Sequence, residues 1–414
     1  MPRRSPDWRG DKVMRKLLVA ALTLVAEAGW AGSLGVDGSL GLQAGYNSNP
    51  LLLTSGARSA ESLALVLDAP LRYTGNTQIF TVRPRLRYAT TSGDVAVLSD
   101  YQYFDASWSS ETERNTWAAD AGWHRDSTLY NQIESSAIPG YNLHRTEEQG
   151  SLSWQRALSE RNDVSAQTSV DRVSYEAQAV PTLSDYKYGA ASVGLVRNLS
   201  ARARIDLTGG FSRYELQDQS YRTDSTNAQL GYTAALSERW SWSAQVGKAW
   251  LKLQQATLQY VVERLPDGTL VLVQRAVQVD SSASTSNYAL KVQRSYERWQ
   301  LEMSATRSLQ PSGLGALLTQ DDFVLKASRD WTERLNLSIA ARELQLSDSL
   351  GPLSSVGGPY YYLDLGASWK LTERWLLQAQ VSGTRQKLSG PTQYINNFSA
   401  FITVARQFGR QRIR

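Results

Sequence analysis

The sequence alternates between apolar and polar residues along most of its length, with a period of two. The clearest stretches begin at Leu335, Leu363 and Trp375, where every second residue is apolar and most residues between are polar or small. A period of two gives a β-strand one apolar and one polar face. No comparable pattern appears at helical spacing, so the chain beyond residue 35 is predicted to be all-β.

Short polar turns divide these strands. They share a Ser/Thr-Glu-Arg or related segment and lie near residues 75, 112, 159, 200, 237, 297, 332 and 372. Between consecutive turns, two strands flank a longer segment rich in Gly, Ser, Asn, Asp and Pro, such as 127–143 or 348–358. Short turns at one rim and long loops at the other are typical of outer-membrane β-barrels. A propeller would repeat four strands in each unit, not two.

The turns and loops together predict a transmembrane, antiparallel, up-and-down β-barrel of 18 strands, from 35–46 to 394–408, with 16 strands as the fallback. An even number returns both termini to the periplasmic side. Pro266-Asp267-Gly268 is interpreted as the turn of a hairpin that projects beyond the membrane. At either strand number the lumen is too wide for side chains to fill, so a channel or a plugged pore is expected.

The N-terminus has the features of a secretory signal. Arg15 and Lys16 precede the apolar run 17–26, and small residues at 29 and 31 suit a cleavage site. We interpret residues 1–31 as a cleaved signal peptide, in which 1–13 are an extended start before Met14, and residues 32–414 as the barrel. The mature chain then holds 38 basic and 36 acidic residues. This balance argues against a nucleic-acid partner.

Trp and Tyr, which outnumber Phe at 13 and 20 against 7, are sorted along the strands. Many Tyr fall toward the long loops: Tyr46, Tyr88, Tyr101, Tyr130, Tyr141, Tyr175, Tyr186, Tyr214, Tyr221 and Tyr394. Nine Trp flank the short turns: Trp108, Trp117, Trp154, Trp240, Trp242, Trp299, Trp331, Trp369 and Trp375. Two aromatic girdles at opposite strand ends match the two interfaces of a bilayer. The predicted location is the bacterial outer membrane.

Catalytic and metal-binding patterns are not found in the sequence. The chain has no Cys and only two His, His124 and His144, and neither lies in a recognisable motif. We therefore expect no enzyme activity, no cofactor and no metal centre. The two His are interpreted as pore-lining residues that could approach each other, and Glu147-Glu148 as a solvated pair close to a loop.

Basic residues gather on the predicted inward face near the first turn. In strand 77–89, Phe80 and Val82 take the outward parity, so alternate residues face the lumen. The resulting candidate substrate path consists of Arg72, Arg83, Arg85 and Arg87. A column of guanidinium groups suits carboxylate or sulfate groups on a passing polymer.

Internal ion pairs are the alternative interpretation of this column. A turn at Gly75 brings Asp68 close to Arg83, and Asp105 on the next strand lies close to Arg85. Counted by parity, the lumen holds eight basic and eight acidic side chains. The lumen is thus positively charged near this column, although its basic and acidic side chains are equal in number overall.

The predicted signal peptide, the segment 45–50 (Gly-Tyr-Asn-Ser-Asn-Pro) at the first long loop and the repeated Ser/Thr-Glu-Arg turns resemble a known family. It comprises the β-barrel porins encoded with exopolysaccharide biosynthesis and export machinery in Gram-negative bacteria. The resemblance covers the whole mature chain and is one of pattern. That family usually ends on an aromatic residue, whereas here Phe408 is followed by Gly409–Arg414. The resemblance implies a channel for an exopolysaccharide chain, working with a periplasmic or outer-membrane polysaccharide-export protein.

Two other functions fit the same residues. One is a general or anion-selective diffusion porin for small solutes, and the other is a structural barrel that sheathes another protein. In each case the lipid bilayer of the outer membrane surrounds the chain. A periplasmic partner would dock on the short turns.

Overall fold

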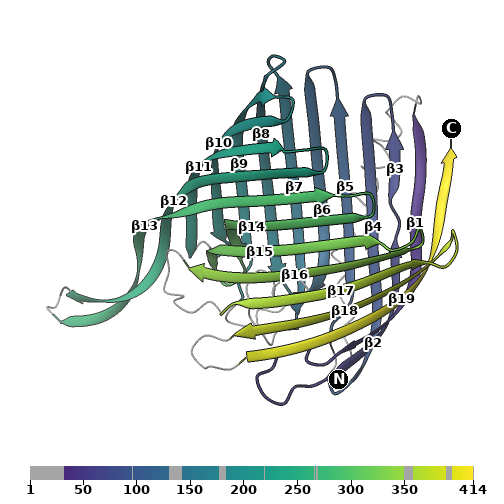
Figure 1. Cartoon of the computed structure of the whole chain (residues 1–414). Coiled ribbons are helices and arrows are strands. Elements are labelled where there is room, and N and C mark those ends of the chain that lie inside the picture. The colour runs from purple at the N-terminus through teal and green to yellow at the C-terminus, as the bar shows by residue number, and fades with distance from the viewer. Residues whose placement is uncertain are drawn as a thin grey trace.

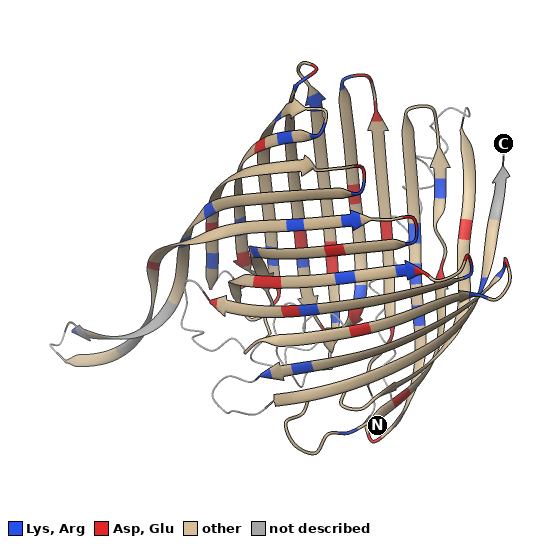
Figure 2. Cartoon of the chain, in the orientation of Figure 1, with Lys and Arg blue, Asp and Glu red and all other residues tan. Residues whose placement is uncertain are grey.

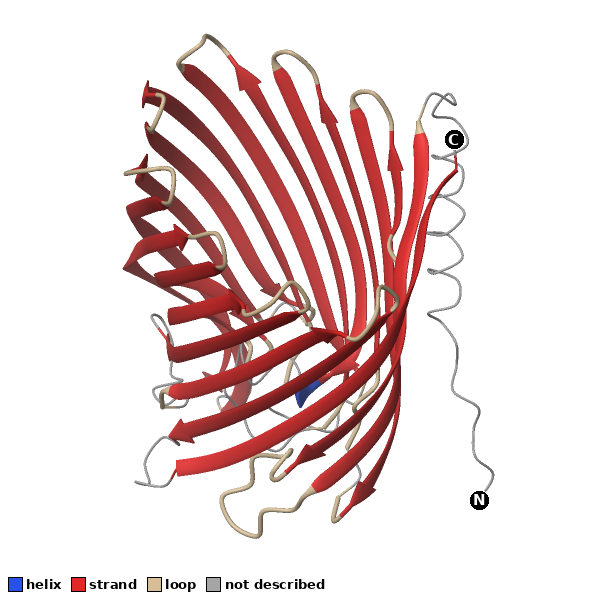
Figure 3. Ribbon diagram, turned by 45° about the vertical axis from the view of Figure 1, so that its right-hand side comes forward, coloured by secondary structure: helices blue, strands red, loops and turns tan. Residues whose placement is uncertain are grey.

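A single antiparallel sheet closes on itself to form a barrel (Figure 1, Figure 3). The computed structural model describes residues 32–95, 97–129, 142–176, 183–218, 220–264, 266, 269–348, 358–387 and 394–413. The predicted signal peptide, 1–31, lies outside them. The sheet closes because the first strand, β1 (Ser33–Asn47), pairs with the last, β19 (Tyr394–Ile413). Closure removes the free strand edges that hydrocarbon cannot satisfy.

The other strands follow one another around the wall in chain order, each antiparallel to its neighbours. They are β2 (Ala60–Asp68), β3 (Leu71–Thr74), β4 (Gln78–Gly93), β5 (Tyr101–Glu111), β6 (Asn115–Ser127), β7 (His144–Ala157), β8 (Asn162–Tyr175), β9 (Tyr186–Ser200), β10 (Ala203–Leu216), β11 (Tyr221–Ala235), β12 (Trp240–Arg264), β13 (Leu270–Ser295), β14 (Trp299–Ser312), β15 (Ala316–Asp330), β16 (Leu335–Asp348), β17 (Tyr360–Lys370) and β18 (Trp375–Lys387). This is the up-and-down arrangement that the turn spacing predicts.

The segments β2 and β3 are two parts of one strand. Both pair with β1 on one side and with β4 on the other. They are separated by Ala69 and Pro70, because proline has no N–H to donate to the ladder. Backbone hydrogen bonds from Asp37 to Pro70 and from Ala69 to Pro84 hold the two edges together. The described residues therefore form an 18-stranded barrel, which confirms the predicted fold class and strand number.

The repeated turns share one local structure. The Thr372 hydroxyl accepts hydrogen bonds from the backbone N–H groups of Arg374 and Trp375. The Arg374 carbonyl in turn accepts from the Gln407 N–H on β19. Hydroxyl groups that cap backbone donors in this way favour tight turns. The same capping occurs at Ser159, Ser237 and Thr332.

The outer wall is apolar. Residues of outward parity with 38% to 61% of their surface exposed include Leu42, Leu65, Val170, Leu207, Val246, Leu337 and Ile402. A continuous apolar surface around a closed barrel fits hydrocarbon rather than water. The protein is accordingly one of the outer membrane. No helix among the described residues is long and apolar enough to span a membrane.

The nine Trp named above all take the outward parity near the short turns. Trp117 lies opposite Trp154, with ring centroids 5.9 Å apart. The Arg329 guanidinium lies over the rings of both Trp299 and Trp331. Rings with one polar edge, stacked on cations, suit the boundary between lipid and water.

The hairpin β12–β13 is longer than its neighbours. Its two strands stay paired as far as Arg264 and Leu270, whereas β11 pairs with β12 only as far as Gln255. Figure 1 shows the end of this hairpin extending beyond the rest of the wall. The pairing confirms the predicted hairpin, whereas residues 265, 267 and 268 at its turn lie outside the described residues.

Candidate functional site

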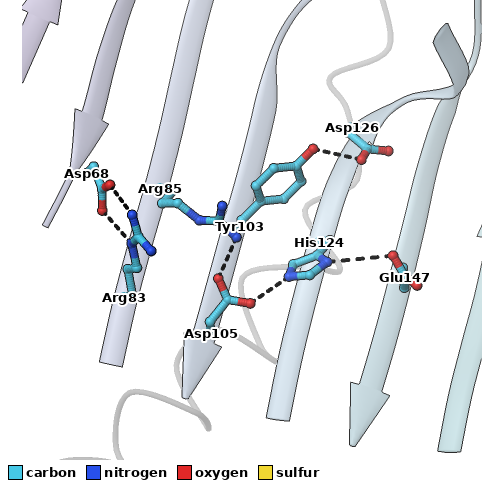
Figure 4. A network of polar contacts seen from close by, with 8 residues as sticks. All are labelled: Asp68, Arg83, Arg85, Tyr103, Asp105, His124, Asp126 and Glu147. Carbon is cyan, nitrogen blue, oxygen red and sulfur yellow. Dashed lines mark hydrogen bonds and ion pairs between the residues drawn. The ribbon is translucent and has the colours of Figure 1, made fainter. Parts of the chain in front are cut away.

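Charged residues are spread over the strands of the wall (Figure 2). Those on the inward faces of β2 and β4 to β7 form a band of contacting side chains (Figure 4). Arg83 Nε and Nη2 donate to the two carboxylate oxygens of Asp68 at 2.8 and 2.6 Å. Arg85 Nη2 donates to Asp105 Oδ2 at 2.8 Å. Both ion pairs agree with the sequence prediction. They are diagonal contacts, because the register places Asp68 opposite Arg85 and Asp105 opposite Arg83. Each guanidinium therefore has a carboxylate partner, and the local positive charge is compensated.

His124 continues this band. Its Nε2 lies 2.7 Å from Asp105 Oδ1, and its Nδ1 lies 3.6 Å from Glu147 Oε2 (Figure 4). The other histidine, His144, takes the outward parity, and its Nε2 lies 3.8 Å from Glu176 Oε2. The two His thus lie on opposite faces of the sheet, so the idea that they approach each other is wrong.

Glu147 and Glu148 also lie on opposite faces, because they are adjacent in one strand. Glu147 faces inward, where its Oε2 lies 3.1 Å from Arg145 Nη1. Glu148 lies opposite Arg172 on the outer face, with 3.9 Å between Glu148 Oε2 and Arg172 Nη1. The interpretation of the pair as simply solvated is therefore wrong for Glu147. The signal that could have placed it is the inward parity of His124 on the neighbouring strand.

Arg87 belongs to the wall of the barrel rather than to the passage. Only 3% of its surface is exposed. Its Nε donates to Gln43 Oε1 at 3.2 Å, and its Nη1 donates to the Ser99 carbonyl oxygen. A buried guanidinium cannot present its charge to a passing polymer, so this geometry does not favour Arg87 as part of the predicted substrate path. Arg83 and Arg72 are exposed, and Arg85 is partly buried.

The end of the β14–β15 hairpin leaves the wall and folds into the barrel. Pairing between β13 and β14 stops at Tyr288 and Arg307, although β14 stays paired with β15 as far as Ser312. The Tyr214 hydroxyl of β10 donates to the Ser312 carbonyl oxygen at 2.7 Å. Tyr214 takes the inward parity. The hairpin end therefore crosses the lumen to reach the inner side of the wall.

Apolar packing fixes the hairpin end against β8 to β12. The cluster consists of Val173, Tyr186, Tyr214, Leu216, Tyr221, Leu251, Leu253, Ala316, Leu317, Leu318 and Leu346, each at most 7% exposed. A fully buried leucine contributes about 1.5–3 kcal/mol relative to an exposed one. Four leucines at most 4% exposed meet at this contact, Leu251 and Leu253 of β12 and Leu317 and Leu318 of the hairpin. Together they would oppose detachment by on the order of 6–12 kcal/mol. We infer a permanent constriction rather than a freely moving loop.

This packing corrects the predicted tyrosine girdle. Tyr46, Tyr88 and Tyr394 lie on the outer face and are 41% to 54% exposed, as expected. The prediction is wrong for other Tyr, because position at a strand end does not determine which face a side chain takes. Tyr186, Tyr214 and Tyr221 are in the inner cluster, Tyr175 packs against it, and Tyr101 stacks on Tyr103. Residues 130 and 141 lie outside the described residues.

A cavity of about 730 Å³ separates the hairpin end from the charged band. Its lining comes from two arcs of the wall that are far apart in strand order: Tyr103, His124, Arg145, Glu147, Gln149, Asp171, Tyr186 and Tyr188 from β5 to β9, and Leu309, Gln310, Pro311, Gln320 and Arg342 from β14 to β16. The volume is within the range of small-ligand sites. Side chains from both arcs meet one cavity, so this is a narrow part of the lumen.

The lumen is mostly polar closer to the short turns. A second cavity of about 590 Å³ is lined mainly by Ser, Thr, Gln and Asn, and Val196, Ala289 and Leu290 also border it. Its charged residues are Asp163, Arg204, Asp206, Lys291 and Glu302. Lys291 Nζ lies 3.0 Å from Glu302 Oε2, so an ion pair forms at this level as well.

Comparison with known proteins finds only solved structures of similar architecture. No protein-family model and no curated protein matches the chain. Among solved structures, Pseudomonas aeruginosa OccK2 (OpdF), in complex with glucuronate, is similar at 12% identity and TM-score 0.43, over 91% of this chain and 98% of that one. Acinetobacter baumannii OccAB2 is similar at 10% identity and TM-score 0.44, over 92% and 98%. The Escherichia coli K12 ferric-catecholate import receptor Fiu, in its open form, is similar at 9% identity and TM-score 0.41, over 90% and 82%.

The geometry of the chain itself carries the conclusion. An 18-stranded closed barrel has an apolar outer wall, and its polar lumen is narrowed by one inward hairpin. Outer-membrane barrels of this size enclose an aqueous passage. The described residues form an outer-membrane β-barrel channel.

Proposed function

We propose that this channel conducts an exopolysaccharide chain out of the cell, together with a polysaccharide-export protein on its periplasmic side. The observation that carries the proposal is the charge-compensated polar lumen. Four of its cations, Arg83, Arg85, Arg145 and Lys291, are paired with Asp68, Asp105, Glu147 and Glu302. Hydroxyl and amide side chains fill the level closer to the short turns. Such a surface can exchange hydrogen bonds with a hydrated, hydroxyl-rich chain without trapping it by net charge.

The nine Trp at the short-turn rim are proposed to anchor the barrel at the periplasmic interface of the membrane. The export partner is proposed to dock on the same rim. The hydroxyl groups of Thr332 and Thr372 accept hydrogen bonds within their turns. The charged residues beside them are exposed: Glu333, Arg334, Glu373 and Arg374. Their side chains form no hydrogen bond or ion pair with other described residues.

The direct experiment is deletion of the gene, with secreted polysaccharide and small-solute uptake measured on the same cells. Loss of secretion with unchanged uptake supports the conduit. Normal secretion with reduced uptake would instead support a small-solute porin. That second candidate is favoured by the inward hairpin, which narrows the lumen to the cavity described above.

A second experiment separates docking from conduction. Reversing the charges at two turns (Glu333→Arg with Arg334→Glu, and Glu373→Arg with Arg374→Glu) should reduce secretion and leave the conductance of the purified barrel unchanged. The matched control reverses the charge of Glu61 (Glu61→Arg), which is exposed on β2 at the opposite rim. Equal loss of secretion in both would argue against docking on the turns.

A further inference from the structure

The cavity at the inward hairpin has the composition of a ligand site and not only of a narrow passage. Both sides of the cavity offer apolar and polar surface. The wall supplies the carboxylate of Asp171 on β8 and the ring of Tyr188 on β9. The hairpin supplies Leu309 and Pro311 together with the amide of Gln320. A pyranose ring has the matching pattern, since its faces carry C–H groups and its edge carries hydroxyl groups.

The charges around this cavity discriminate between classes of sugar. Arg145 Nη1 lies 3.1 Å from Glu147, and Arg342 donates to both carboxylate oxygens of Asp322, at 2.7 and 3.1 Å. Both cations that line the cavity are therefore already compensated. An acidic sugar would also approach Asp171 and Glu147, where like charges repel.

Asp171 is the group left available to a ligand. It lies in register between Gln149 and Tyr188, both of which also line the cavity. Its carboxylate forms no hydrogen bond or ion pair with another described residue. A half-buried carboxylate without a protein donor is well suited to accept hydrogen bonds from ligand hydroxyl groups.

We propose that the cavity between β5–β9 and the β14–β15 hairpin is a binding site for neutral saccharide. In it Asp171 and Gln320 bind the hydroxyl groups from opposite sides. The inference rests on the proposed function for the class of ligand and deepens it, since it excludes an acidic polymer. The site exists only because the hairpin end is folded inward, so selectivity is set at this one level of the lumen.

The test uses the full barrel in a planar bilayer. The probes are maltoheptaose, which is neutral, and an oligogalacturonate of equal length, which is acidic. The measured quantity is the concentration of each probe that halves the ion current. Maltoheptaose should block at the lower concentration. The Asp171→Ala variant should need about tenfold more maltoheptaose, as expected for the loss of a hydrogen bond to a charged group.

Two further variants keep the test informative. Gln320→Ala probes the hairpin side of the same cavity and should raise the half-blocking concentration severalfold. Asp120→Ala removes an exposed inward carboxylate on β6, outside the cavity, and should leave that concentration unchanged. Heat-modifiable migration on gels identifies the folded variants, and Gln320→Ala carries the test if Asp171→Ala does not fold.

Three results would overturn the proposal: a tighter block by oligogalacturonate, no block by either probe, or equal effects of Asp120→Ala and Asp171→Ala. None of these depends on export. Failure of the binding site is thus distinguishable from failure of the proposed function, which appears as unchanged secretion after gene deletion.

Discussion

Two stretches of the inward face of this barrel differ in construction although they follow the same alternation. On β4 to β7 the inward side chains are charged and paired with one another, as Arg85 is with Asp105. On β10 to β12 the inward side chains near the long-loop rim include Tyr214, Leu251 and Leu253, all at most 4% exposed. The difference arises because the β14–β15 hairpin covers the second stretch and not the first. Parity determines which side a residue faces, and the covering segment determines whether that side is wet.

The largest expected effect comes from the apolar contact itself. Leu318 is fully buried at the hairpin end. Leu318→Asp would place an unpaired carboxylate there, at a cost of about 3–5 kcal/mol if it stays buried. The lost leucine adds about 1.5–3 kcal/mol to this cost, so the variant offsets most of the packing energy that opposes detachment. The hairpin end should therefore open from the wall far more often, while the rest of the barrel remains closed. Single-channel conductance should therefore rise.

The matched control is Leu318→Met, which keeps an apolar side chain of similar size at the same contact. Such volume-conserving exchanges cost less than about 1.5 kcal/mol, so the hairpin end should stay packed against the wall. The conductance of this variant should stay close to that of the unaltered chain. Unchanged conductance in a folded Leu318→Asp barrel would mean that the hairpin does not limit the passage.

The contrast also shows which features of the structure could be predicted from the sequence. Strands, turns and the pairs Arg83–Asp68 and Arg85–Asp105 depend on neighbours within two adjacent hairpins, so alternation and turn position suffice to predict them. The contact between Ser312 and Tyr214 joins residues 98 positions apart that are not on adjacent strands. No local pattern encodes it. The apolar run 314–318 after Pro311 was the available sign, because a loop exposed to water has no need of three leucines in five residues.

The alternation that both stretches obey can be tested on the outer face. Leu337 faces lipid and Ser338 faces the lumen. Leu337→Arg should lower the free energy of unfolding by about 2–4 kcal/mol, because it places a charge in hydrocarbon. Ser338→Arg should be tolerated, since its face is wet. Urea titration of the barrel in liposomes measures the free energy of unfolding of both variants. Equal losses of stability would indicate a sheet buried on two sides.

Within the charged stretch, Arg83 and Arg87 of β4 should differ in their contribution to stability, because they differ in burial. Arg87 is 3% exposed, and Arg87→Gln removes its hydrogen bonds to Gln43 Oε1 and to the Ser99 carbonyl oxygen. The expected cost is about 1–3 kcal/mol. Arg83→Gln breaks an ion pair whose side chains are 48% and 30% exposed, and pairs of that kind contribute about 0.2–1 kcal/mol. If Arg83→Gln proves the more damaging in urea titration, the wall role given to Arg87 is wrong.

The smallest expected effect concerns ion selectivity, which the paired charges should nearly cancel. Neutralising Arg83 and Arg85 together, each to Gln, leaves Asp68 without its cation and Asp105 with only His124, and it should shift the reversal potential modestly toward cations. Neutralising the two acids instead, each to Asn, should shift it toward anions by a similar amount. Neutralising all four should restore a value close to that of the unaltered barrel, because the pairs contribute little net field. The shifts should be clearest at low salt, where screening is weakest. A quadruple variant that keeps the shift of the arginine double variant would show that the guanidinium groups act on ions despite their partners.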